Sequence, residues 1–213
     1  MKRQRWTLVR HGETEGESSI RLNGATDVAL NDHGRAQMVR VASALRRKHF
    51  DMAYSSPLSR SHESAQIVAE PHVLPIDVVD GFRELNFGEW EGMTYEEVAA
   101  RDPERLAQRQ SDARDFTYPG GDSRESFEAR VRAATRSVVG SAESVLLVLH
   151  KGVIKVALSE LLGLPFEDYR SLPVDLASIH VVELSTQAPN YTVRNDTQHL
   201  GELHIADAVA PRQ

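Results

Sequence analysis

Two short apolar runs, far apart in the chain, end in the same kind of sequence. Residues 6–9 are followed by an arginine, His11 and a glycine, and residues 145–149 by His150, a lysine and a glycine. Short apolar runs bounded by charge or glycine are typical of buried strands. In open α/β sheets, ligands bind beyond the carboxyl ends of the strands. If the two strands are parallel, both imidazoles project into one crevice.

Short apolar runs alternate with segments of helical spacing along the rest of the chain. Further strands are expected at 50–54, 76–79, 178–184 and 191–194. Helices are expected to begin at Asn31 or Asp32, at Asp122 or Ser123, and at Gly152, and another has Pro57 at or near a first-turn position. Two short exposed helices are expected within 94–110. Such alternation predicts an α/β fold, a three-layer α/β/α sandwich with a mostly parallel central sheet.

The length and composition narrow the classes of protein that this chain can represent. A chain of 213 residues is expected to form a single domain, 1–213, in which the charged segment 90–118 is an insertion that covers a pocket. The net charge of −6 and the absence of basic blocks predict that the chain does not bind nucleic acid. Because the apolar runs are too short to span a bilayer and cysteine is absent, we expect no membrane partner and a cytoplasmic location.

Two further side chains complete a set that suits phosphate chemistry. Arg60 follows the second strand at the start of a helix, and Glu84 follows the third strand in a loop rich in glycine and aromatic residues. Arginine binds phosphate oxygens in a fork geometry, and a neutral imidazole can act as a nucleophile. A glutamic acid can protonate the departing alkoxide. With Arg10, His11 and His150, these residues indicate phosphoryl transfer.

Each residue also has an ordinary structural interpretation. Arg10 and His11 are equally consistent with a strand end that carries two solvated polar residues, and Arg60 with a surface arginine. His150 could be a helix-start residue that bonds to the backbone. Other carboxylates compete with Glu84 for the acid role, namely Glu13, Glu89 and Glu91.

The motifs LVRHGET, SSPLSR, ELNFGEWEG, PGGDS and VLLVLHKGVIK, in this order, resemble those of the histidine phosphatase superfamily, also called the phosphoglycerate mutase-like family. The resemblance covers residues 8–200. It implies a phosphoglycerate mutase-like fold and a reaction that needs neither a metal nor a cofactor.

The resemblance also implies a role for each residue of the set. By position, His11 accepts the phosphoryl group, and Arg10 and Arg60 bind its oxygens. His150 stabilises the group during transfer, and Glu84 acts first as the general acid and then as the base for water. Asn23 matches a position where relatives often carry a polar side chain that touches phosphate.

The chain departs from the family pattern at Gly16 and Glu17, where many relatives carry a tryptophan and an asparagine. A carboxylate at this place would oppose a bound phosphate. We therefore expect either that Glu17 turns outward or that the pocket differs on this side.

The family contains several activities, and the sequence favours one of them. Mutases carry extra basic and serine-rich segments for a second phosphate, and 94–118 contains none. We therefore expect a phosphatase, similar to α-ribazole phosphatases and broad-specificity phosphatases, that acts on a small phosphorylated metabolite. The alternatives are a cofactor-dependent phosphoglycerate mutase, a phosphoprotein phosphatase and a phosphate-binding module without catalysis. The sequence predicts no oligomeric state, although an exposed Trp90 or the edge near 178–184 could support a dimer.

Overall fold

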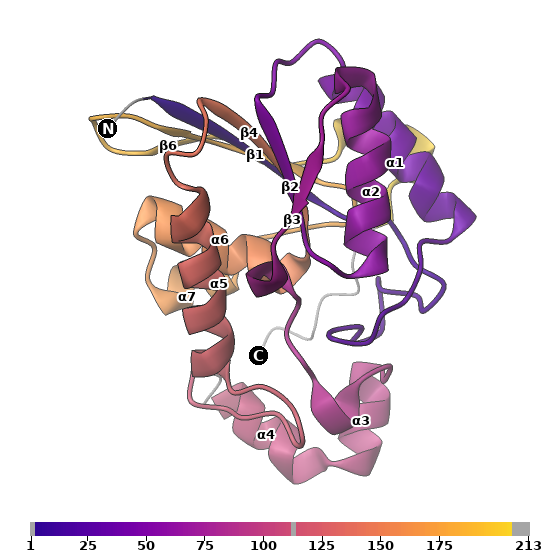
Figure 1. Ribbon diagram of the computed structural model, residues 1–213. Coiled ribbons are helices and arrows are strands. Elements are labelled where there is room, and N and C mark those ends of the chain that lie inside the picture. Colours follow the sequence, from indigo (N-terminus) through magenta and orange to yellow (C-terminus); the bar gives the residue numbers. More distant parts are fainter. Residues whose placement is uncertain (1–2, 112–113, 206–213) are drawn as a thin grey trace.

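The computed structural model describes residues 3–111 and 114–205, and in these ranges a six-stranded sheet forms the centre of the molecule (Figure 1). The strands lie side by side in the order β3-β2-β4-β1-β5-β6. They are β1 (Gln4–Arg10), β2 (Met52–Ser55), β3 (Ile76–Val78), β4 (Ser144–Leu149), β5 (Ile179–Leu184) and β6 (Asn190–Asp196).

The prediction of a mostly parallel sheet is confirmed, with a difference at one side. β3, β2, β4 and β1 are parallel to their neighbours, whereas β5 pairs antiparallel with β1 and β6 antiparallel with β5. β5 and β6 follow each other closely in the chain, which permits a hairpin and therefore antiparallel pairing. Apolar patterning is the same for both directions, so the sequence does not show this reversal.

Helices cover both faces of the sheet. α1 (Asp32–Leu45) and α2 (Ser59–Ala69) lie side by side on one face, whereas α5 (Arg124–Val138) and α6 (Lys151–Leu162) pack together on the other, where α7 (Phe166–Arg170) adjoins α6 (Figure 1). Single 3-10 turns occur at η1 (Glu70–His72), η2 (Asp80–Phe82) and η3 (Gly88–Trp90), and η4 (Gln198–Leu203) lies against α1. The α/β/α layers that we expected are therefore present.

Alternating side chains of the strands supply the two cores between these layers. In β4, Val145 and Leu147 face the α5 and α6 side, and Leu146 and Val148 face the α1 and α2 side. All four are fully buried. Burial of one such side chain contributes roughly 1.5–3 kcal/mol, so the central strands are firmly fixed and give the residues at their ends a rigid base.

Local capping explains where several helices begin. The Asn31 side chain accepts a hydrogen bond from Gly34 N, and the Ser123 side chain accepts one from Ser126 N, as expected for N-cap residues. Pro57 was expected at or near the first turn of a helix, and it lies two residues before α2, which begins at Ser59 with Leu58 as its N-cap. Ser56 Oγ accepts a hydrogen bond from Leu58 N, and this local turn keeps Pro57 outside the helix.

The segment after β3 extends away from the sheet. It carries α3 (Tyr95–Arg101) and α4 (Pro103–Ser111), which lie together at one end of the molecule and are separated at Asp102, as the sequence indicated (Figure 1). Residues 112 and 113 of the expected pocket-covering segment fall outside the described residues.

Neither of the two places named as possible dimer contacts is exposed in the way that we expected. Trp90 is buried in the core on the α5 and α6 side, and β5 is covered by β6 rather than lying at the edge. None of the helices in the described ranges combines the length and the apolar character that a bilayer span requires.

Candidate active site

His11 and His150 lie next to each other at the carboxyl ends of β1 and β4. The two strands are parallel neighbours with Arg10 opposite Leu149, so the next residue of each strand falls at the same level. The backbone amide of His11 donates to Leu149 O at 3.0 Å. The ring centroids of His11 and His150 are 5.2 Å apart, with an interplanar angle of 62°. The structure thus brings both histidines into one place, as the strand-end pattern predicted.

The His11 ring is held in one tautomer. Its Nδ1 lies 2.7 Å from the carbonyl oxygen of Gly12, and because a carbonyl only accepts, Nδ1 carries the proton. Nε2 is then the nitrogen with the lone pair. Burial, and next the charges of Arg60 and Arg10, hold the pKa of His11 well below its usual value, so the ring is neutral near neutral pH.

His150 occupies the N-cap position of α6, yet its side chain makes no capping hydrogen bond. Among the described residues, neither of its ring nitrogens has a hydrogen-bond partner, although the residue is completely buried. Burial and the nearby Arg60 lower its pKa well below the usual value. A buried polar group without partners is costly and is expected at sites that bind ligands. The interpretation of His150 as a helix-start residue bonded to the backbone is therefore not supported.

Arg10 and Arg60 bring positive charge to the two histidines, and backbone carbonyls help to hold both guanidinium groups. Arg10 Nη1 donates to Val174 O at 2.8 Å. Arg60 Nη1 donates to Thr26 O at 2.8 Å and Nη2 to Gly24 O at 2.6 Å. Both residues are buried, so Arg60 is not a surface arginine. The hydrogen bonds of Arg60 go to backbone carbonyls, so its guanidinium group keeps its full charge for an anion, which it can bind through the fork geometry of its donors.

Glu84 lies beside this cluster, and its carboxylate is fixed by two backbone amides. Oε1 accepts from Leu85 N at 2.9 Å, and Oε2 accepts from Gly152 N at 2.8 Å. The residue is buried, and its charge acts on Arg60. Because Gly152 lies in the first turn of α6, the Glu84 carboxylate is hydrogen-bonded to the helix whose N-cap is His150.

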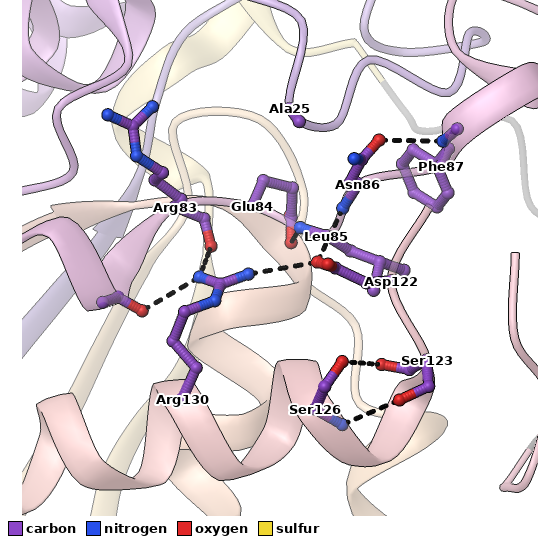
Figure 2. A network of polar contacts seen from close by, with 12 residues as sticks. Ala25, Arg83, Glu84, Leu85, Asn86, Phe87, Asp122, Ser123, Ser126 and Arg130 are labelled. Carbon is purple, nitrogen blue, oxygen red and sulfur yellow. Dashed lines mark hydrogen bonds and ion pairs between the residues drawn. The ribbon is translucent and has the colours of Figure 1, made fainter. Parts of the chain in front are cut away.

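The loop that carries Glu84 is itself tied to α5, as Figure 2 shows. Arg130 Nη1 donates to Gly81 O at 3.2 Å and to Arg83 O at 2.7 Å, and Nη2 donates to Asp122 Oδ2 at 3.2 Å. Asp122 Oδ2 also accepts from Asn86 N at 3.1 Å. These contacts hold the chain on both sides of Glu84. The sequence indicated Asp122 only as part of the PGGDS motif and as a possible helix start, and the contact of Asp122 and Arg130 with the Glu84 loop could not be predicted, because their spacing carries no signal of it.

The competing carboxylates have other partners. Glu13 Oε1 accepts from Thr14 N at 2.9 Å and from Ser18 Oγ at 3.0 Å. Glu89 has a 57% exposed side chain and forms an ion pair with Arg101. Glu91 accepts hydrogen bonds from backbone amides of two loops. Glu84 is the one of these that contacts the first turn of α6.

Asn23 and Glu17 lie in the loop that follows β1. Asn23 reaches the site through its backbone, since its carbonyl oxygen accepts from Arg60 Nη2 at 3.2 Å, while its Nδ2 donates to Gly16 O at 2.6 Å. Glu17 turns outward: its side chain is 62% exposed and pairs with Arg21 at 3.4 Å. Of the two expectations for Glu17, the outward orientation is the one observed.

The arrangement as a whole suits a dianionic ligand. Two buried guanidinium groups, two neutral imidazoles and a carboxyl group meet at one end of the sheet, and they can bind and act on a phosphate. In the described part of the chain, no group of three or more His, Asp or Glu side chains is arranged to hold a metal ion.

Comparison with known proteins gives a consistent result. The family model of the histidine phosphatase superfamily, branch 1, matches residues 6–197. The chain is 31% identical over 200 residues to phosphoserine phosphatase 1 of Hydrogenobacter thermophilus, covering 93% of this chain and 95% of that protein. It is 34% identical over 179 residues to the glucosyl-3-phosphoglycerate phosphatase of Mycolicibacterium vanbaalenii, covering 79% of each. The crystal structure of the α-ribazole phosphatase from Shigella flexneri superposes with a TM-score of 0.82 at 25% identity, covering 91% of this chain and 96% of that chain.

Proposed function

The chain belongs to the histidine phosphatase superfamily, and from this premise we propose that it hydrolyses phosphate monoesters through a phosphohistidine formed at His11. It is a phosphatase of the histidine phosphatase type, and the relatives described above carry the names of phosphatases. One observation carries the mechanism: the bond from His11 Nδ1 to Gly12 O leaves a neutral Nε2 with its lone pair next to two buried arginines.

In the first step, His11 Nε2 attacks the phosphorus atom. The P–N bond forms, the P–O bond to the alcohol breaks, and the acid form of Glu84 gives its proton to the departing alkoxide oxygen. Arg10, Arg60 and His150 surround the phosphoryl oxygens and stabilise the charge that they carry during transfer. Two guanidinium groups supply the positive charge that a metal ion provides in other phosphatases, so the proposed reaction requires no metal or other cofactor.

In the second step, water attacks the phosphorus atom of the phosphohistidine. The carboxylate of Glu84 takes a proton from that water, the P–N bond breaks, and inorganic phosphate leaves. His11 returns to its neutral form, and Glu84 is again protonated. The hydrogen bonds from Leu85 N and Gly152 N keep both oxygens of the Glu84 side chain in place.

The substrate that we propose is a small phosphorylated metabolite. The relatives are named for phosphoserine, glucosyl-3-phosphoglycerate and α-ribazole phosphate, which are small phosphate esters. We further propose that 1–213 is one domain in which 90–118 covers the pocket and selects the substrate, and that Asn23 contributes to phosphate binding. In support, Arg21 pairs with Glu97 of α3 at 2.9 Å, which joins this segment to the loop that holds Arg60.

We also propose a cytoplasmic location, supported by the complete absence of cysteine in the 213 residues.

The test is a panel of phosphorylated metabolites assayed with a chelator present. The wild type is expected to release inorganic phosphate, and His11→Ala is expected to lose activity by about 10³-fold or more, because the nucleophile is gone. A phosphoenzyme that is labile in acid and stable in alkali should be trapped in the wild type alone. Full activity in His11→Ala would disprove the mechanism. Incubation with 3-phosphoglycerate and its bisphosphorylated cofactor should give net phosphate release rather than interconversion.

A further inference from the structure

Glu91 binds a loop that forms part of the site, although its own carboxylate lies outside the catalytic set. Oε1 accepts from Ala25 N at 2.9 Å, and Oε2 accepts from Gly24 N at 3.1 Å and Thr26 N at 3.2 Å. Three consecutive amides of the loop therefore point at one carboxylate. This arrangement resembles the concave groups of backbone N–H donors that bind anions.

The carbonyl side of the first two of these peptides, and of the peptide after Thr26, faces Arg60. The carbonyl oxygens of Asn23, Gly24 and Thr26 accept from its guanidinium group at 3.2, 2.6 and 2.8 Å. The loop thus lies between a negative carboxylate on its N–H side and a positive guanidinium on its C=O side. Each charge polarises the peptide dipoles in the direction that strengthens the other contact.

The fit between Glu91 and this loop is close. A Cβ atom on Gly24 would lie 1.9 Å from Leu85 O and 2.5 Å from Glu91 Oε1, so a glycine is required for this approach. Glu91 Oε1 also accepts from Phe87 N at 2.8 Å, which joins the loop to the segment that carries Glu84. The far end of the loop is held separately, since Asp27 Oδ1 accepts from Ser59 N at 2.7 Å.

We propose that Glu91 is a positioning residue for Arg60: it fixes the 23–26 loop, and the loop carbonyls orient the guanidinium group that binds the phosphoryl oxygens. This role rests on the proposed phosphatase function. In this role, Glu91 does not touch the substrate and exchanges no proton during the reaction. Its loss is expected to weaken oxyanion binding at Arg60 while leaving proton donation by Glu84 intact.

The chain offers a matched control two residues away. Glu89 lies in the adjoining turn η3, is exposed, and pairs with Arg101 of α3 rather than with the 23–26 loop. Glu91→Gln and Glu89→Gln remove the same charge from neighbouring positions with almost no change in shape. Only the first removes a charge from the amides of the 23–26 loop.

The experiment measures the dissociation constant for inorganic phosphate by calorimetry, together with kcat and KM for a series of phosphate esters of increasing leaving-group acidity. Glu91→Gln is expected to weaken phosphate binding and raise KM by about 10- to 100-fold, because the guanidinium is misplaced. The dependence of kcat on the leaving group should stay that of the wild type. Glu89→Gln should change these constants by about twofold at most.

A double-mutant cycle shows whether Glu91 acts through Arg60. If it does, Glu91→Gln in an Arg60→Ala background causes little further loss of kcat/KM, whereas independent action gives additive losses and overturns the proposal. A folded Glu91→Gln protein that binds phosphate as the wild type does also overturns it. Should Glu91→Gln fail to fold, Glu91→Asp, which keeps the charge on a shorter side chain, is judged by the same outcomes. A wild type that neither binds nor hydrolyses phosphate would overturn the phosphatase function itself.

Discussion

Glu84 and Gly152 are joined by a hydrogen bond in which the amide of Gly152 donates to Oε2 of Glu84 across 2.8 Å. This bond connects the loop after β3 to the first turn of α6, two residues after His150. A Cβ atom on Gly152 would lie 2.5 Å from Oε1 of Glu84, closer than real Cβ atoms approach an oxygen. The carboxylate and the second histidine therefore share one rigid support.

Gly152→Ala tests this support. The added methyl group is expected to push the Glu84 carboxylate aside and lower kcat for alkyl phosphates by about 10- to 100-fold. Steady-state kinetics and a denaturant melt of the same sample separate misplacement from unfolding. If Glu84 is the group affected, Gly152→Ala adds little to Glu84→Gln; additive losses would mean that the methyl acts elsewhere.

Glu84→Gln tests proton transfer itself. Esters with poor leaving groups should lose about 10²- to 10⁴-fold in kcat/KM, because an alkoxide departs slowly without a proton. Aryl phosphates with acidic phenols should lose far less, since their leaving groups need no proton. The measurement is a plot of log kcat/KM against leaving-group pKa, and an equal loss across the series would contradict the acid role.

Arg130→Met tests the network of Figure 2. Removal of the guanidinium frees the carbonyls of Gly81 and Arg83 and the carboxylate of Asp122, so the Glu84 loop loses its anchor on α5. We expect a loss of about tenfold in kcat that grows as the leaving group becomes poorer. Arg136→Met on the same helix is the control, because Arg136 is exposed and pairs with Glu160. Equal effects of the two variants would argue against a role of Arg130 in positioning Glu84.

The acidic limb of the pH–rate profile is expected to report the protonation of the two buried histidines, His11 and His150. Burial and the charges of Arg60 and Arg10 lower the pKa of His11 well below 6.5, and His150 is lowered in the same way. Both rings therefore stay neutral as the pH falls through 6.5, and kcat/KM should not drop with a pKa near that value once the second ionisation of the substrate phosphate is corrected for. A histidine titration by NMR provides the independent check. Protonation of His11 near pH 6.5 would contradict the prediction.

His180 links pH to stability away from the site. It is buried in β5 between Ser178 and Tyr191, and burial lowers its pKa to about 4, against a small opposing effect of Asp175. Between pH 6.5 and about 4 the unfolded chain binds a proton that the folded chain excludes, so stability falls as the pH drops through this window. The gap corresponds to on the order of 3 kcal/mol. Urea melts at pH 7 and pH 4.5 should show a smaller decrease for His180→Gln than for the wild type, and equal decreases would contradict the assignment.

The sequence predicted those features that a local pattern encodes. The run 145–149 is a buried strand because five apolar residues precede His150, and α1 and α5 begin directly after Asn31 and Ser123 because these side chains cap helices. The grouping of His11 with His150 follows from parallel neighbours that end in similar residues. Their catalytic roles stay predictions that the experiments above can test.

Features that depend on distant contacts were not readable from the sequence. The antiparallel direction of β5 and β6 leaves no trace in apolar patterning, and the five residues of α7 are too few for a helical period. Glu91 could be considered only as a possible acid, since its contacts with the 23–26 loop join segments more than sixty residues apart. In the sequence, Arg130 cannot be distinguished from other arginines on a helix surface, and only the fold reveals its contact with the Glu84 loop.

The register of β1 against β4 limits which insertions and deletions the chain can accept. His11 and His150 meet because Arg10 stands opposite Leu149, and side chains alternate between the faces of a sheet along each strand. Deleting or inserting one codon within Gln4–Arg10 or Ser144–Leu149 would turn every following side chain of that strand to the other face and separate the two rings. Length variation is therefore expected to be excluded from these two strands, which an in-frame codon-deletion library selected for phosphatase activity would display directly.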